Sequence, residues 1–152
     1  MKYAELEAKE VSKLLLKPGD ILFVRTNGNP EYVGRCAVFE EGYGDTLYAS
    51  HLIRARLKVN AQLYPAFIRD IISFPTYRSR LVSEARTTAG NYNINTEGLG
   101  RLRLIKPPLK EQESYIKLRF QLNTREEKQK RQLIESGTLF NSLLQRAFRG
   151  EL

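Results

Sequence analysis

The sequence predicts an α+β fold, in which a small domain of mixed short strands and short helices is followed by a long C-terminal helix. Three features of the 152 residues support this prediction. The chain is 41% hydrophobic, which is enough to bury a core. Short apolar runs separated by turn-forming residues occupy residues 1–106, and residues 109–152 contain no proline. We therefore expect one domain at residues 1–106 and a helical segment at residues 107–152.

Apolar runs that follow turn signals predict the first strands. Pro18-Gly19-Asp20 predicts a tight turn, and residues 21–24 then carry apolar side chains on both faces, as buried strands do. A second strand is expected at residues 33–39, where Cys36 is expected to be a small core residue.

Residues 52–59 show the clearest alternation in the chain. Apolar side chains share one face, and Arg54, Arg56 and Lys58 share the other. This pattern predicts a half-buried strand whose cations keep the outer face in solvent. Residues 101–104 repeat the pattern over a shorter span.

Helices are expected at residues 64–73 and 76–85, with a helical turn at residues 95–99. Pro65 suits the first turn of the first of these helices. The polar stretches at residues 25–30 and 87–93 are rich in Asn, Gly and Thr, which predicts loops.

The long helix is expected to begin near Lys110 and to pair with another helix. Its middle, residues 123–132, is almost wholly polar, whereas its two ends carry apolar side chains. A domain of this size cannot cover a 40-residue helix, which would be about 60 Å long. The apolar stripe predicted to bind a partner helix comprises Ile116, Phe120, Leu133, Phe140, Leu144 and Phe148.

Catalytic signatures are scarce in the sequence. One cysteine and one histidine, His51, exclude an intrachain disulfide and a His/Cys zinc site within one chain. Neither a nucleotide-binding P-loop nor a dinucleotide-binding glycine motif occurs. We therefore expect no cofactor, no metal and no catalytic residue. Asp20, with Glu31 nearby, is the one candidate for a nuclease centre, but an Asp in Pro-Gly-Asp is more often a turn former.

The charge favours an anionic partner. The formal net charge is +8, and residues 69–106 contain seven basic and three acidic side chains. Six of those seven cations are Arg, which suits phosphates and guanine edges better than Lys does. The N-terminal residues do not resemble a signal peptide and no apolar run approaches 20 residues, so the cytoplasm is the expected location.

Double-stranded DNA is the predicted anion, and the polar loops supply most candidate contacts. Asn amides suit adenine edges, Arg suits guanine or phosphate, and a Tyr can stack or contact a backbone. The alternative for each Asn is a purely structural role in a turn with positive φ. The candidate DNA-binding residues are Arg25, Thr26, Asn27, Asn29, Arg35, Arg78, Arg80, Arg86, Asn91, Tyr92 and Asn93.

Several segments together resemble one known family, the DNA specificity subunits of type I restriction–modification systems. Residues 16–28, which include Lys17-Pro18-Gly19-Asp20, resemble the second half of a target-recognition domain, as do residues 33–35 and 49–54. Residues 87–95 resemble the loop before the last strand. Residues 99–112, with Pro-Pro-Leu-x-Glu-Gln, resemble the junction into a conserved spacer helix, and residues 142–152 resemble its end.

The resemblance implies a non-catalytic subunit that recognises one half of a split DNA target. It further implies that long helices pair as an antiparallel coiled coil, which spaces two recognition domains and docks methyltransferase subunits. Modification and cleavage would then belong to those partners and to a restriction subunit.

The chain departs from the family pattern because it carries one long helix and part of one recognition domain. We expect the domain to be N-terminally incomplete. The alternatives are a fragment, a truncated gene product or a half-subunit that forms a homodimer through the long helix. The alternative hypothesis is a protein-interaction module that acts through the long helix without independent DNA binding.

Overall fold

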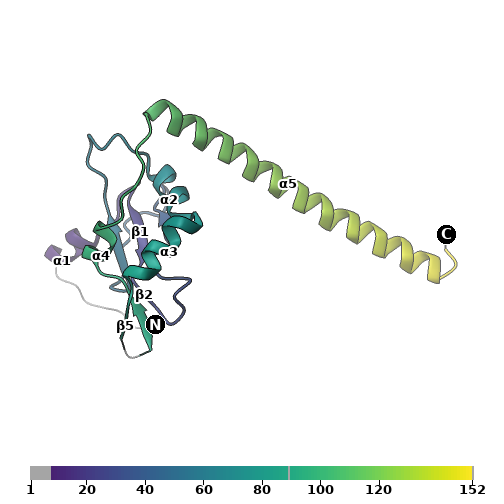
Figure 1. Cartoon of the computed structure of the whole chain (residues 1–152). Coiled ribbons are helices and arrows are strands. Elements are labelled where there is room, and N and C mark those ends of the chain that lie inside the picture. Colours follow the sequence, from purple (N-terminus) through teal and green to yellow (C-terminus); the bar gives the residue numbers. More distant parts are fainter. Residues whose placement is uncertain (1–7, 89, 152) are drawn as a thin grey trace. The chain divides into compact units, whose positions relative to one another are not determined.

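The computed structural model describes residues 8–88 and 90–151 (Figure 1). The chain divides into two compact units, Met1–Gln112 and Glu113–Leu152. The first unit combines small antiparallel sheets with short helices, and the second belongs to one long helix. The predicted α+β class is therefore confirmed.

The core sheet has three strands, with β1 (Ile21–Val24) between β3 (Cys36–Val38) and β4 (Leu52–Ala55). Both pairings are antiparallel, and Ile21 lies opposite Val38 on one side and Ala55 on the other. Because side chains alternate along a strand, Ile21 and Phe23 both point into the core, where they are 1% and 3% exposed.

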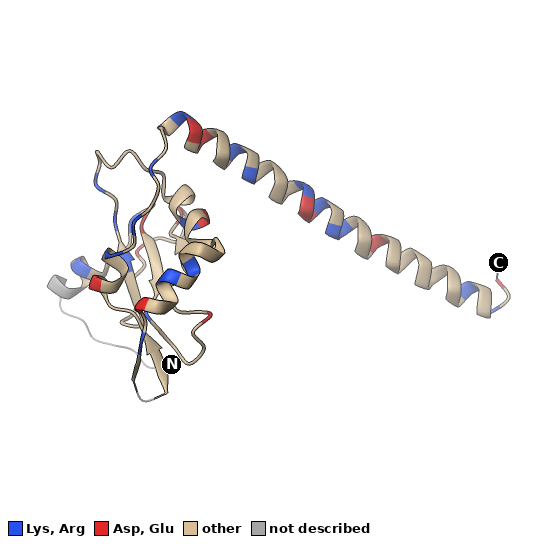
Figure 2. Ribbon diagram, in the orientation of Figure 1, with Lys and Arg blue, Asp and Glu red and all other residues tan. Residues whose placement is uncertain are grey.

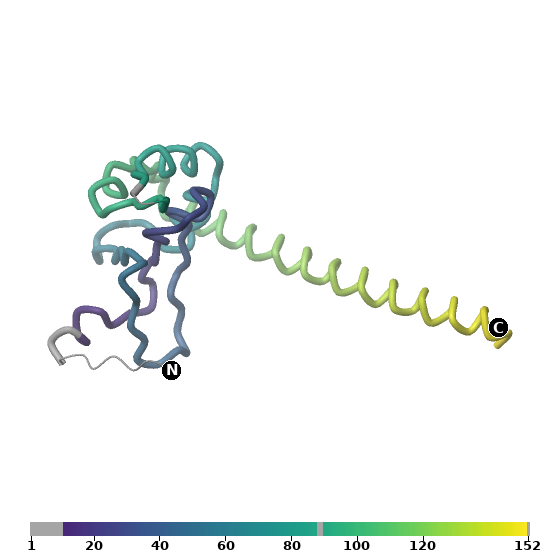
Figure 3. The backbone as a smooth tube through the Cα atoms, turned by 90° about the horizontal axis from the view of Figure 1, so that it is seen from below, coloured from purple at the N-terminus to yellow at the C-terminus, as the bar shows by residue number. Residues whose placement is uncertain are grey.

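Short helices cover the core sheet. These are α2 (Pro65–Ser73), α3 (Pro75–Glu84) and α4 (Thr96–Gly100), while α1 (Ala8–Leu14) precedes β1. Figure 3 shows α2 to α4, in teal and green, gathered to one side of the purple and blue strands. Pro65 and Pro75 each start a helix, where their missing N–H costs no intrahelical bond. The core that results joins Ile68 and Ile72 of α2 and Leu81 of α3 to the sheet.

A second three-stranded sheet occupies two segments that the sequence predicted as loops. It has the order β2 (Thr26–Asn27), β6 (Asn91–Asn93) and β5 (Arg86–Thr88), all antiparallel. The loop prediction was wrong there because polar β-strands lack the apolar alternation that indicates a strand. Backbone pairing, locally between β5 and β6 and over a long sequence separation between β2 and β6, forms these strands.

Three other strand predictions were too long or wrong. The strands expected at residues 33–39 and 52–59 shorten to β3 and β4, and Val59, expected on the inward face, is fully exposed. Residues 102–108 have no regular secondary structure, although Leu102 and Leu104 still pack against the core. The alternation in this segment places Leu102 and Leu104 against the core, but no neighbouring strand forms backbone hydrogen bonds with it, so it is not a β-strand.

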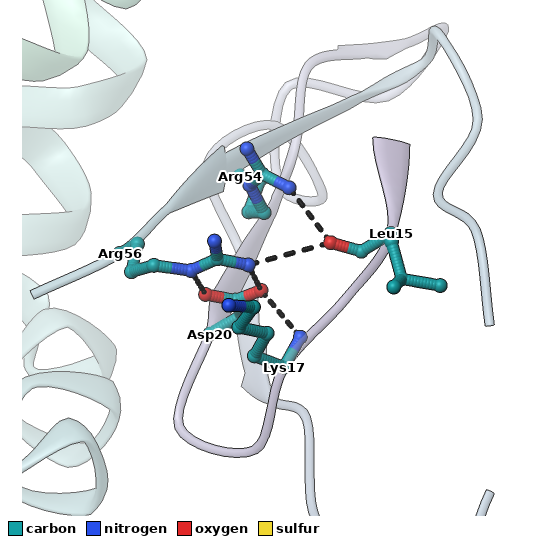
Figure 4. A network of polar contacts seen from close by, with 5 residues as sticks. All are labelled: Leu15, Lys17, Asp20, Arg54 and Arg56. Carbon is teal, nitrogen blue, oxygen red and sulfur yellow. Dashed lines mark hydrogen bonds and ion pairs between the residues drawn. The ribbon is translucent and has the colours of Figure 1, made fainter. Parts of the chain in front are cut away.

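Arg54 of β4 and Arg56 just beyond it were expected on a solvent-exposed strand face. Both instead make hydrogen bonds to other residues of the domain (Figure 4). Arg56 Nε and Nη2 donate to the two carboxylate oxygens of Asp20, at 2.6 and 2.7 Å. The Lys17 N–H also donates to Asp20, and Arg54 Nη1 donates to the carbonyl of Leu15 at 2.9 Å. These bonds connect the Pro-Gly-Asp turn and the segment before it to the strand whose cations were expected only to keep its outer face in solvent.

The long helix α5 (Leu109–Phe148) has 40 residues, close to the predicted start and end. Its first four residues belong to the domain unit and the rest form the second unit. Gly137 lies within this continuous helix.

Candidate nucleic-acid interface

The second sheet brings together candidate residues that lie about sixty positions apart in the sequence. In the pairing of β2 with β6, Thr26 lies opposite Asn93 and Asn27 opposite Tyr92. In the pairing of β5 with β6, Arg86 also lies opposite Asn93. The loops at residues 25–30 and 87–93, predicted separately as DNA-binding segments, therefore form one surface of the domain.

The pairing register sorts these residues onto two faces. Residues directly opposite each other in an antiparallel pair project from the same face, so Thr26, Arg86 and Asn93 share one side. Asn27 and Tyr92 share the other. Tyr92 is half-buried and packs against the hydrophobic core.

Two of the four loop asparagines make local turns. Asn27 Oδ1 accepts from the Asn29 N–H, and Asn29 Oδ1 accepts from the Glu31 N–H, both at 2.9 Å. These bonds match the structural alternative of a turn, although no Asn in the described chain has positive φ. Among the described residues, the side chains of Asn91 and Asn93 have no hydrogen-bond partner.

A shallow polar hollow of about 170 Å³ lies beside the second sheet. Its lining residues are Arg25, Glu84, Arg86, Asn93 and Asn95. Asn95 Oδ1 caps α4 by accepting from Gly98, and Glu84 binds Arg101 at 3.2 Å. The hollow thus gathers two exposed guanidinium groups and one amide with free hydrogen-bonding capacity.

Arg35 and Arg78, both predicted to contact phosphates, are partly used by the domain itself. Arg78 Nη2 donates to the carbonyls of Glu31 and Val33, at 2.9 and 2.8 Å. Burial, and then the charge of Arg35, lower the pKa of Arg78. Arg35 is exposed, and its guanidinium lies 4.4 Å from the centre of the Tyr32 ring. Both arginines therefore hold this loop, since Arg35 Nε also donates to the carbonyl of Glu31 at 2.9 Å, and Arg35 remains exposed.

Arg80 lies on the exposed side of α3, apart from the second sheet. It lines a small hollow with Arg101 and Arg103. This cationic group is separate from Arg35, which lines a different hollow with Arg78.

Asp20 and Cys36 have no reactive geometry. Burial raises the pKa of the Asp20 carboxyl, but the hydrogen bonds from Arg56 and the Lys17 N–H, together with the Arg56 and Arg54 charges, outweigh burial. The Asp20 pKa therefore lies below its ordinary value. Burial raises the pKa of the Cys36 thiol to about 11, which keeps it protonated at neutral pH.

The predicted partner-binding residues of α5 project from its surface. Phe120, Leu133, Phe140, Leu144 and Phe148 are all exposed, and Ile116 is partly exposed. Figure 2 shows charged residues concentrated along the first part of α5, and residues 136–145 carry no charge. Residues 136–145 of α5 therefore expose apolar side chains without any charged residue among them. None of the described helices is both long and apolar enough to span a bilayer.

Two curated proteins match the chain. It is 32% identical to the type I restriction enzyme EcoKI specificity subunit of Escherichia coli over all of its length. It is also 32% identical to the StySPI specificity subunit of Salmonella potsdam over 97% of its length. The chain is related to type I restriction enzyme specificity subunits. No family model matches it.

This relationship confirms the resemblance predicted from the residues. The chain spans about a third of the length of each curated specificity subunit that it matches.

The motif that resembles the junction of specificity subunits contains a residue whose role the sequence did not reveal. Gln112, the last residue of Pro-Pro-Leu-x-Glu-Gln, is fully buried. Its Oε1 accepts from the Tyr64 N–H at 3.0 Å, and its Nε2 donates to the carbonyls of Gln62 and Pro107, at 3.1 and 2.7 Å. The amide thereby fastens the first turn of α5 to the loop before α2. Nothing in the sequence indicated this burial, because Gln112 is a polar side chain between Glu111 and Glu113.

Proposed function

We propose that this chain is a DNA-sequence recognition polypeptide of a type I restriction–modification enzyme, which recognises one half of a split target. One observation carries the proposal. A chain related to specificity subunits assembles, from two distant segments, an exposed polar sheet that contains Arg86, Asn91 and Asn93. Such groups match the base edges and phosphates of duplex DNA.

In this proposal the chain itself performs no catalysis. The buried carboxylate of Asp20 is bound by two nitrogens of Arg56, so it is not available as a metal ligand or a base. The reactions would belong to methyltransferase subunits and to a restriction subunit. Those assemblies operate on cellular DNA, which fits a cytoplasmic location.

The long helix would carry the second part of this function. Its exposed apolar side chains, including Phe140 and Leu144, need a partner helix to leave water. A second spacer helix, from another copy of this chain or from a longer subunit, would pair with α5 and present a docking surface for methyltransferase subunits.

A salt titration of duplex binding tests the DNA-recognition proposal. The purified chain, alone and with its methyltransferase partner, is titrated with a short duplex at about 50 to 200 mM salt. Each phosphate contact that releases counterions steepens the decline of affinity with salt. We expect a steep decline, with Arg35→Gln making it shallower by about one phosphate contact. Affinity that is independent of salt would refute the proposal.

The alternative function is an interaction module that acts through α5 alone, and the exposed Phe140 and Leu144 specifically favour a helix partner. Replacing both by Gln should abolish self-association measured by light scattering, while leaving the domain folded. Exposed Gln129 and Gln132, changed to Ala, provide a control pair in the polar middle of the same helix. Duplex binding that survives loss of the dimer would separate the two functions.

A further inference from the structure

We infer that one face of the β2–β6–β5 sheet reads base edges, and that the opposite face is structural. The base-reading face comprises Thr26, Arg86, Asn91 and Asn93. The inference rests on the proposed DNA-recognition function, because it assigns roles within the DNA-binding surface. Strand geometry separates the candidate residues into base-reading and structural ones, a distinction that residue type alone does not make.

The strand register defines the two faces. In β6, Asn91 and Asn93 alternate with Tyr92, so the two amides share a face and the ring projects from the other. Tyr92 packs on the core, and Ile94, two residues further along, is completely buried. Tyr92 and Ile94 are therefore packed within the domain on one face, although Thr87 of β5 remains exposed there. Asn91 and Asn93 project from the other face.

Hydrogen-bonding capacity gives the same division. Asn27, Asn29 and Asn95 use their side-chain oxygens on nearby backbone N–H groups. In the part of the chain that the structure describes, Asn91 and Asn93 make no such bond, and neither does the guanidinium of Arg86. A free amide can bond adenine N6 and N7 together, and a free guanidinium can bond guanine O6 and N7.

The dimensions of the β5–β6 pair suit the major groove. Neighbouring strands lie about 4.8 Å apart, and the groove is about 12 Å wide, so two strands enter it side by side. Gly90, between the two strands, has φ of 79°, and a Cβ placed there would have no atom within 4 Å. The described residues therefore leave space for a side chain at this position.

Arg25, which directly precedes β2, adds a second guanidinium group beside the sheet. It lines the hollow of about 170 Å³ with Arg86 and Asn93. The adjacent carboxylate of Glu84 is already engaged by Arg101. Two cations and one amide consequently face the same space, an arrangement suited to a guanine-containing base step and its phosphate.

Selection from a randomised duplex library tests the assignment. The unchanged chain, Asn93→Ala and Arg86→Gln are each used to enrich bound sequences at fixed salt, in the presence of the methyltransferase partner. We expect each variant to lose discrimination at one or two base positions by about tenfold. Thr87→Ala is the matched control, since Thr87 is exposed and neighbours Arg86 in sequence but projects from the opposite face. Its selected sequences should equal those of the unchanged chain.

The outcomes separate the two levels of the proposal. Sequence-selective binding that is insensitive to both Asn93→Ala and Arg86→Gln, in variants whose unfolding is unchanged, would overturn the face assignment alone. So would a change of preference caused by Thr87→Ala. No duplex binding by the unchanged chain would overturn the DNA-recognition function and the assignment together.

Discussion

The two three-stranded sheets of this domain make opposite use of polar side chains. In and around the β3–β1–β4 sheet, Asp20, Arg54 and Arg56 bond one another or backbone carbonyls within the domain. In the β2–β6–β5 sheet, Arg86, Asn91 and Asn93 make no side-chain hydrogen bond to any described residue. Both sheets are antiparallel and have three strands. Charge or strand propensity therefore does not distinguish a structural arginine from a binding one, whereas its partners do.

The comparison also separates stability from recognition. Strand β1 is stabilised by apolar burial, with Ile21 and Phe23 almost inaccessible to solvent. Strand β6 is stabilised mainly by backbone pairing and by Tyr92 beneath it. Changes in the first sheet should therefore reduce stability, and changes on the polar face of the second should reduce binding with little effect on stability.

The largest expected difference between the sheets is between Phe23→Ala and Asn91→Ala. Removal of the Phe23 ring leaves a cavity in the core and should lower the free energy of unfolding by about 3–5 kcal/mol. Asn91 is exposed, and its replacement should change that free energy by less than about 0.5 kcal/mol. Urea denaturation followed by circular dichroism measures both. Equal losses for the two variants would eliminate the distinction.

A smaller effect is expected from Asp20→Asn. The change removes the negative charge that two Arg56 nitrogens bind, and leaves the remaining hydrogen bonds weaker. We expect a loss of about 2 kcal/mol, less than for a fully buried pair because the Arg56 side chain is 40% exposed. Asp45→Asn, in an exposed turn, is the control. Identical urea midpoints for the two variants would show that the Asp20–Arg56 pair is dispensable.

The same pair should make stability depend on pH. Because the pKa of Asp20 is lower in the folded state, folding favours its ionised form. Its contribution is therefore fully present above the unfolded value, about 3.9, and is lost as the pH falls through the lower folded value. The difference in urea midpoint between the unchanged chain and Asp20→Asn should accordingly be constant from pH 7 to 5 and shrink below pH 4. A difference that grows on acidification would contradict this assignment.

The smallest expected change in stability distinguishes two asparagines of the second sheet, Asn27 and Asn93. Asn27→Ala removes the bond from the Asn29 N–H, which lies on the surface, and should cost about 0.5–1 kcal/mol. Asn93→Ala removes no bond within the domain and should cost less. Differential scanning calorimetry of the two variants compares them directly. A greater loss for Asn93→Ala would indicate a structural role that its geometry does not show.

The sequence predicted elements whose pattern is local. Helices α2, α3 and α5 follow from 3.6-residue periodicity and from prolines at their starts, and β1 follows from an apolar run after a turn. Strands β5 and β6 were missed because residues 86–93 are mostly polar, so backbone pairing with each other and with β2, rather than apolar alternation, makes them strands. Residues 101–104 have the pattern of a strand but not the partner.

The candidate site was predicted as a set of residue types, and the register supplied its geometry. Sequence reasoning selected Asn27, Asn29, Asn91 and Asn93 alike because each is an amide in a turn-rich segment. Two of them make turn bonds and two do not, which depends on where the neighbouring N–H groups lie. In the same way, the sequence did not distinguish Arg78 from Arg35, yet the Arg78 guanidinium donates a hydrogen bond to the backbone carbonyl of Val33 within the domain.

The buried amide of Gln112 determines where this chain can be joined to another. A chimaera whose crossover follows Gln112 keeps the amide with Tyr64 and Gln62, its partners from the same parent. A crossover at Pro107 would take Gln112 from one parent and its partners Gln62 and Tyr64 from the other. The hydrogen bonds would then form only if the two parents had compatible structures at both segments. Interchange of helices between related chains is therefore least disruptive immediately after the first turn of α5, and not at the prolines that mark the boundary in the sequence.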